Sequence, residues 1–126
     1  MEFFKIINIE TSQEWIQENI TIDNLEKITE TNFAIEMKGN NALIGTLWGE
    51  FDLSYDKING GVRFALTSCP NGLAWTITTG YPPERSKLII HATINRTQKP
   101  QEFIDETNDF LDDWETGLLK FFKEIN

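Results

Sequence analysis

The last quarter of the chain, Lys99 to Asn126, has the hydrophobic spacing of one long amphipathic helix. When the residues are projected at about 100° per residue, one side of this helix contains Phe103, Thr107, Phe110, Leu111, Trp114, Leu118, Phe121, Phe122 and Ile125. The other side collects the carboxylates Glu102, Asp105, Glu106, Asp109, Asp112 and Asp113. This pattern predicts a helix that buries one face and presents an acidic face to solvent.

Short segments of different character come first in the chain. Phe3 to Ile9 is an apolar run rich in β-branched residues, which predicts a strand. Thr11 and Glu14 have the spacing of a capping box, which predicts a short helix after the strand. Asp23 and Glu26 repeat that spacing and predict a second short helix.

From Asn32 onward the hydrophobic period changes to two, and turn signals at 39–41, 59–61, 69–72 and 81–86 divide the region into strands. A single strand is predicted across Gly45 and Gly49, with both glycines on its inner face beside Leu47. The inward positions expected along the strands are Phe33, Ile35, Met37, Leu43, Leu47, Phe51, Leu53, Val62, Phe64, Leu66, Leu73, Trp75, Ile77, Leu88, Ile90, Ala92 and Ile94.

Short connections between strands with one apolar face predict an antiparallel meander. We therefore expect one α+β domain spanning residues 1–126, with a short N-terminal strand, two small helices, a meander of about five strands and the C-terminal helix packed across the sheet. Gly117 lies beside the apolar stripe of that helix, where a missing side chain favours close approach to the sheet.

The charge of the chain is concentrated in the predicted helix. The formal net charge is −9, and residues 101–115 contain seven acidic residues and no basic one. Binding to nucleic acid or to an anionic membrane requires Lys and Arg patches, so this balance disfavours both. The acidic face is either a solvated surface that maintains solubility or a docking surface for a basic protein partner.

The N-terminus and the cysteine content bear on the compartment. The first residues lack the basic segment and the long apolar core of a signal peptide, and no window is apolar enough for a membrane span. The single Cys69 has no internal disulfide partner, as is typical of a reducing compartment. These features favour a cytoplasmic protein.

Catalytic and metal-binding patterns are sparse. One histidine and one cysteine are too few for the usual zinc sites, and we expect His91 to be a semi-exposed residue of the sheet. Glu50 and Asp52 form a carboxylate pair two residues apart, on a face expected to be solvated, where no pKa would be raised. The sequence therefore predicts a protein that is not an enzyme and has no cofactor and no metal.

Two aromatic residues are further candidates for partner binding. Trp48 is expected to share its strand face with Glu50 and Asp52, which is typical of an interface anchor within a charged rim. Coverage of Trp48 by Trp15 or by the N-terminal phenylalanines is the alternative. Tyr81 stands in a Tyr-Pro-Pro loop that could serve recognition or merely turn the chain.

Three functional hypotheses follow. In size, acidity and lack of catalytic residues the chain resembles small bacterial immunity proteins and phage-borne inhibitors, which implies a monomer or weak homodimer that blocks a basic toxin or nuclease. Its element order resembles the helix-grip fold of the Bet v 1 and START-like families, which implies a ligand cavity between helix and sheet. The acidic C-terminal helix is also similar to those of type III secretion chaperones, which implies an escort role.

Overall fold

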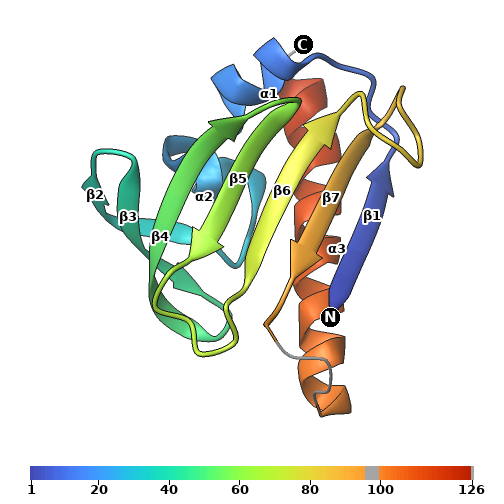
Figure 1. Cartoon of the computed structure of the whole chain (residues 1–126). Coiled ribbons are helices and arrows are strands. Elements are labelled where there is room, and N and C mark those ends of the chain that lie inside the picture. Colours follow the sequence, from blue (N-terminus) through green and yellow to red (C-terminus); the bar gives the residue numbers. More distant parts are fainter. Residues whose placement is uncertain (96–99, 126) are drawn as a thin grey trace.

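The computed structural model describes residues 1–95 and 100–125, so Lys99 and Asn126, the predicted bounds of the last helix, lie outside the described residues. The elements follow the expected order, with one more strand in the meander than predicted (Figure 1). They are β1 (Glu2–Ile7), α1 (Gln13–Asn19), the 3₁₀ turn η1 (Ile22–Asn24), α2 (Leu25–Ile28), β2 (Phe33–Lys38), β3 (Asn41–Thr46), β4 (Gly49–Ile58), β5 (Gly61–Leu66), β6 (Ala74–Thr79), β7 (Leu88–Thr93) and α3 (Gln101–Ile125).

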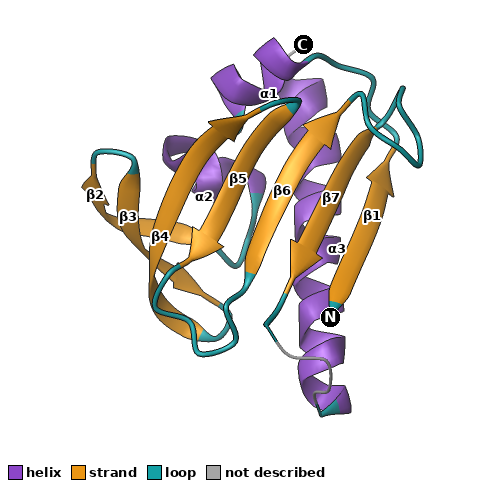
Figure 2. Cartoon of the chain, in the orientation of Figure 1, coloured by secondary structure: helices purple, strands orange, loops and turns teal. Residues whose placement is uncertain are grey.

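The strands form one seven-stranded sheet in the order β1-β7-β6-β5-β4-β3-β2, and every neighbouring pair is antiparallel. The helices lie on one face of this sheet, with α3 running along it behind β1 and β7 (Figure 2). The predicted α+β class, the antiparallel meander and the packed C-terminal helix are confirmed.

The core lies between α3 and the sheet, where aromatic rings pack against one another. The Trp75 ring centroid is 4.9 Å from that of Phe110 and 6.0 Å from that of Trp114, and Phe64 packs 5.3 Å from Trp75. All four residues are at most 1% exposed. The apolar stripe of the helix and the inward faces of β5, β6 and β7 therefore pack as the sequence pattern predicts, whereas Ile125 at the end of α3 remains exposed.

The caps of the short helices differ from the prediction. Ser12, and not Thr11, is the N-cap of α1, because its Oγ accepts a hydrogen bond from the backbone N–H of Trp15 at 3.1 Å. No capping box forms at Asp23, where the chain instead makes η1 and then enters α2 without a side-chain cap. Both predicted short helices are present. The capping-box spacing from Thr11 to Glu14 and from Asp23 to Glu26 did not identify their capping residues.

Strand β2 does not bury its apolar residues as expected. Phe33, Ile35 and Met37 are each 45–46% exposed. A bulge between Ala34 and Glu36 shifts the register against β3, so that Ala34 lies opposite the buried Ile44 instead. Because β2 is the last strand of the sheet, no further strand lies beside it in the described part of the chain.

The strand predicted across Gly45 and Gly49 is two strands, β3 and β4, joined by a tight turn. Thr46 lies opposite Gly49 in the register, and Gly49 has a φ of +118°, which favours glycine. Leu47 is consequently exposed in the turn and not inward. Gly45 faces outward under the ring of Phe33, which would collide with any Cβ at this position.

Gly117 permits a close approach, but the element that approaches is not the sheet. A Cβ on Gly117 would lie 1.6 Å from the carbonyl oxygen of Ile28, at the end of α2. The glycine therefore allows α2 to pack directly on α3, and this contact carries the Thr29–Asn32 segment into its position beside the acidic face.

Candidate functional site

The acidic face of α3 is arranged as its spacing predicts, but its members differ in their surroundings. Glu102, Asp105, Asp109 and Asp112 are exposed, whereas Glu106 and Asp113 are half-buried. The face is bordered by β1 on one side and by α2 with the following loop on the other.

On the β1 side, Lys5 binds two carboxylates of α3. Its Nζ lies 2.6 Å from Asp112 Oδ1 and 3.7 Å from Glu115 Oε1. The hydrogen bond to Asp112 and the charge of the two carboxylates raise the pKa of Lys5 above its ordinary value, although burial acts in the opposite direction. Sequence reasoning missed Lys5, and the available signal was a single charge inside the apolar run of the first strand.

On the α2 side, Asp113 holds the loop that precedes β2. Its carboxylate accepts hydrogen bonds from the N–H of Glu30 at 3.0 Å, from the N–H of Thr31 at 3.1 Å and from the Thr31 hydroxyl at 2.5 Å. Three donors of this kind satisfy a carboxylate without any partner molecule. Asp113 therefore has a structural role in holding this loop, and its role in partner binding stays a prediction.

Between this loop and α3 lies an open groove of about 430 Å³. Acidic side chains stand on both walls, with Glu26 and Glu30 on one and Asp109 and Asp112 on the other. The complete lining is Glu26, Lys27, Ile28, Thr29, Glu30, Thr31, Asp109, Asp112, Asp113, Thr116, Gly117 and Lys120. Sequence reasoning missed the contribution of Glu26 and Glu30, because tertiary contacts bring them beside the helix: Ile28 packs on Gly117, and the backbone of Glu30 binds Asp113.

Three exposed acids of α3 have no cationic partner among residues 1–95 and 100–125, namely Glu102, Asp105 and Asp109. Asp105 accepts a hydrogen bond from the side-chain amide of Gln101 at 2.9 Å, which orients it along the helix. Such carboxylates, fixed on a rigid helix and open to solvent, can bind Lys or Arg side chains of a partner.

Trp48 does not share an exposed face with Glu50 and Asp52, and that prediction is wrong. The β3–β4 turn directs its half-buried ring toward α3, where it packs 5.6 Å from Phe103 and 5.5 Å from Phe110. The covering residues are thus neither Trp15 nor the N-terminal phenylalanines. Trp48 anchors the turn against the first half of the helix.

Glu50 and Asp52 are both exposed on β4. They lie opposite Gly45 and Leu43 in the register and alternate with positions that face the buried Ile44, so they belong to the outer face of the sheet, away from α3. The backbone N–H of Asp52 donates a hydrogen bond to Ser68 Oγ at 2.9 Å. The structure therefore does not bring this pair together with the acidic face of α3.

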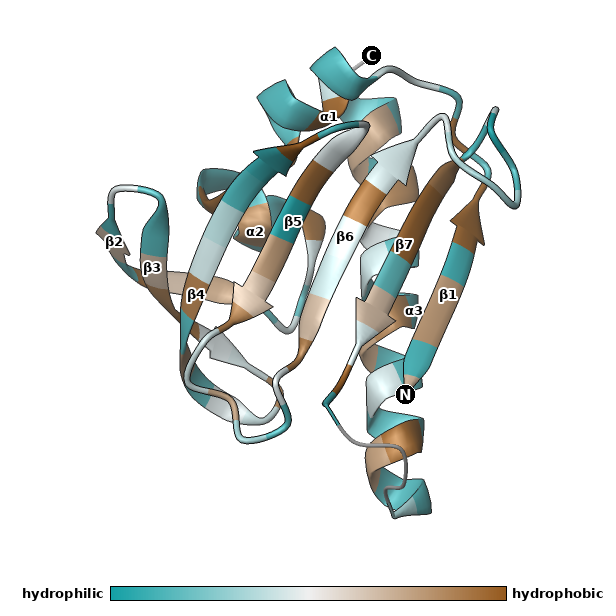
Figure 3. Ribbon diagram, in the orientation of Figure 1, coloured by the Kyte–Doolittle hydropathy of each residue, from teal (hydrophilic) through white to brown (hydrophobic). Residues whose placement is uncertain are grey.

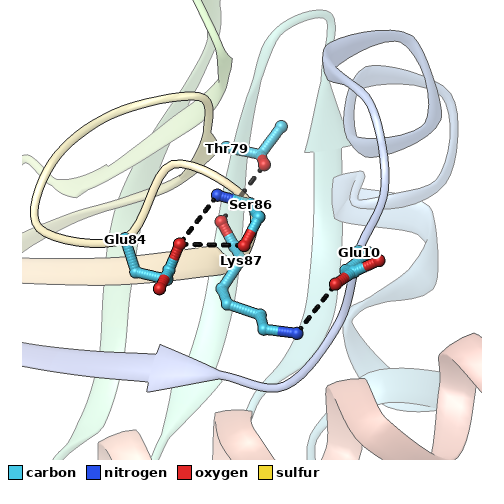
Figure 4. A network of polar contacts seen from close by, with 5 residues as sticks. All are labelled: Glu10, Thr79, Glu84, Ser86 and Lys87. Atoms are coloured by element: carbon cyan, nitrogen blue, oxygen red, sulfur yellow. Dashed lines mark hydrogen bonds and ion pairs between the residues drawn. The ribbon is translucent and has the colours of Figure 1, made fainter.

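Tyr81 lies at the far end of the sheet from Trp48 and is 44% exposed. Its ring rests against Gly60 in the β4–β5 turn. The loop that carries it is tied down after Glu84, as Figure 4 shows: Glu84 accepts hydrogen bonds from the N–H and the hydroxyl of Ser86, and Lys87 Nζ lies 2.9 Å from Glu10. The Ser86 donors lower the pKa of Glu84.

His91 is a half-buried residue of the sheet, as expected. Its ring stacks on Phe4 with centroids 4.3 Å apart, and its Nε2 lies 3.1 Å from Glu2 Oε1. In the described part of the chain, no group of three or more His, Cys, Asp or Glu side chains is placed to hold a metal ion.

The space between α3 and the sheet, where a helix-grip protein would hold a ligand, contains the buried rings of Phe64, Trp75, Phe110 and Trp114. Among the described helices, none has the length and apolarity needed to cross a membrane. No protein-family model, curated protein or solved structure matches the chain.

Proposed function

We propose that this chain is a non-enzymatic binding domain that recognises a basic protein through the acidic face of α3, in the manner of an immunity protein or antitoxin that occupies the surface of a toxin or nuclease. The observation that carries the proposal is the row of exposed carboxylates Glu102, Asp105 and Asp109, which have no cationic partner among the described residues. The groove beside α2 extends this acidic surface through Glu26 and Glu30.

The acidic face affects both the rate at which a basic partner is met and the strength with which it is held. A row of carboxylates presents the charge that a nucleic-acid-binding surface is built to receive, so it accelerates association with such a surface. Because α3 is held on both sides by Lys5 and by the Thr31 loop, the carboxylates need little ordering when they bind. Glu50, Asp52 and Tyr81 lie on other surfaces, and the proposal does not depend on them.

The filled core supports this function over the helix-grip alternative. A carrier of apolar ligands requires an open cavity, whereas here four large aromatic side chains occupy the space between helix and sheet. Among the described residues, no contact favours the escort role over partner inhibition.

The test compares capture of basic proteins from the native host by immobilised wild type and by a triple variant, Glu102→Gln, Asp105→Asn and Asp109→Asn. A matched control removes the same charge from the exposed acids of the N-terminal segment, Glu14→Gln, Glu18→Gln and Asp23→Asn. We expect one basic protein to bind wild type and the control, to elute between about 0.1 and 0.5 M salt, and to be lost from the triple variant. Equal capture by the triple variant and the control would refute the acidic-face proposal.

A further inference from the structure

The free edge of the sheet at β1 combines unpaired main chain with exposed apolar side chains. In the part of the chain that the structure describes, β7 is the neighbour of β1 on one side, and the other side carries no strand (Figure 1). Phe4 is 56% and Ile6 48% exposed on this edge strand. The pairing of β1 with β7 runs through six consecutive residue pairs without a bulge, so the edge is regular.

The hydrogen bonding of β1 shows which main-chain groups point to the free edge. Met1 and Ile94 exchange two hydrogen bonds, of 3.0 and 3.2 Å, at the start of the β1–β7 ladder. Because the pattern of an antiparallel ladder alternates, the N–H and C=O groups of residues 3 and 5 also point toward β7. Those of Glu2, Phe4 and Ile6 point the opposite way, toward the open side.

The two faces beside this edge differ in chemistry. Residues 2, 4 and 6 place their side chains on the outer face, where Phe4 stacks on His91 and Ile6 lies opposite Ile89. Figure 3 shows that hydrophobic and hydrophilic residues both occur along β1 and β7. Residues 3, 5 and 7 face α3, and Lys5 reaches Asp112 and Glu115 there. Helical spacing places Asp105 on the same side of α3 as Asp112. A strand added beside β1 would therefore contact the apolar side chains of Phe4 and Ile6 on the outer face, next to the Glu2–His91 pair, and carboxylates of α3 on the inner face.

From this arrangement we propose that the basic partner contributes an extended segment with alternating apolar and basic residues, which adds antiparallel to β1 as an eighth strand. This inference rests on the proposed function and specifies how the partner binds. The apolar residues of the segment contact Phe4 and Ile6 and exchange hydrogen bonds with the free main chain. Its basic residues extend over the inner face toward Asp105 and Asp112.

The charge beside β1 favours a basic segment of the partner over a second copy of this chain as the added strand. An inward-pointing lysine often protects a sheet edge, but Lys5 is already ion-paired with Asp112 and leaves the inner side acidic overall. Two copies joined through β1 would bring their two acidic α3 helices together across the symmetry axis, which like-charge repulsion opposes. A basic segment instead brings positive charge next to the carboxylates of α3, which is favourable.

The probe for the test is a labelled seven-residue peptide, acetylated and amidated, in which Lys alternates with Val. Two matched versions carry three N-methyl groups, on the valines in one and on three lysines in the other. In antiparallel addition the valine N–H groups bond to β1 and those of the lysines point away. We expect methylation of the valines to weaken binding at least about tenfold relative to methylation of the lysines.

One further measurement uses the wild-type protein, and another uses a charge variant. On addition of the unmethylated peptide, amide hydrogen exchange should slow at Phe4 and Ile6, whereas the amides of Phe3 and Lys5 are already protected by β7. The variant Asp105→Asn should weaken all three peptides, because it removes a carboxylate toward which their lysines extend.

Equal binding of the two methylated peptides, or stronger binding of the valine-methylated one, would refute strand addition. If Asp105→Asn still weakened binding in that case, the basic-partner proposal would stand alone, whereas failure of every peptide to bind would contradict both. Protection of Phe4 in a dimer without peptide would place a second copy on the edge and overturn the inference.

Discussion

Replacing Gly117 with alanine tests the contact that positions the acidic groove. In an exposed helix, Gly→Ala is expected to stabilise by about 1 kcal/mol. Here the new Cβ would lie 1.6 Å from the Ile28 carbonyl oxygen and 2.7 Å from its carbon, both main-chain atoms. The carbonyl must retreat by roughly 2 Å to restore ordinary contact. This shift separates α2 from α3 and stretches the hydrogen bonds between Asp113 and Thr31.

The expected magnitude follows from those contacts. Weakening hydrogen bonds to a half-buried carboxylate costs about 2–4 kcal/mol in total, which exceeds the gain in helix propensity. Gly117→Ala should therefore lower the free energy of unfolding by roughly 1–3 kcal/mol.

Urea unfolding followed by tryptophan fluorescence measures this change as a lower midpoint at unchanged slope. The matched control is Thr116→Ala, one residue earlier and exposed, which should change stability by less than about 0.5 kcal/mol. If Gly117→Ala were neutral or stabilising, the packing of Ile28 against the helix would not be the reason for the glycine, and the groove would not depend on it.

Three further outcomes are expected. Asp113→Asn should destabilise the protein by about 1–3 kcal/mol in urea unfolding, because the backbone donors that it satisfies lose a charged acceptor, whereas Asp109→Asn should not; equal effects would contradict the structural role of Asp113. Trp48→Ala should cost about 2–4 kcal/mol through lost packing on α3, and a smaller loss than about 1 kcal/mol would contradict this contact. Burial raises the pKa of Tyr55 to about 12 from 10.0. Because the unfolded chain therefore loses this proton first, stability should fall as pH rises from 10 toward 12. Absorbance titration of a Tyr81→Phe variant isolates this phenol, and a midpoint near 10 would refute its burial.

The fold could be predicted from the sequence where burial follows the local pattern. Trp75 and Trp114 lie on the stripes that their periods assign to the core, and both are fully buried. At β2 the same reasoning fails, since alternation identifies an apolar face but not whether anything covers it. Phe33 and Met37 belong to an edge strand, and the bulge after Ala34 changes which residues face the core.

The turn between β3 and β4 shows a second limit of sequence reasoning. Leu47 and Trp48 are large apolar residues, and such residues predict a strand and not a two-residue turn. The glycine at 49 was the available signal, because its positive φ closes the turn. The chain reverses direction at this turn, so residues 47 and 48 do not alternate with the strand positions on either side. The predicted surroundings of Trp48 were wrong for this reason.

The sequence predicts where the acidic face lies on α3, but not which of its acids are bound by other residues of the chain. Helical periodicity places the carboxylates of α3 on one face, yet it cannot show which of them the fold itself uses. Asp112 is bound by Lys5 and Asp113 by Thr31, residues distant in sequence whose proximity depends on the complete fold. Reversing the charge of Asp112 would therefore disturb an internal ion pair, and a test of partner binding must leave it unchanged.

This division of the acids has a consequence for binding strength. The contacts of Asp112 and Asp113 reduce the charge that is available to a partner, but they also fix α3 between β1 and the loop before β2. The remaining carboxylates of Glu102, Asp105 and Asp109 are thereby presented on a rigid support. Since ordering of flexible groups opposes association, a smaller number of pre-oriented charges can bind a basic surface more tightly than a larger number on a mobile helix. The internal contacts of Asp112 and Asp113 thus hold the helix in place, and we propose that Glu102, Asp105 and Asp109, which have no cationic partner among the described residues, make the contacts with the partner.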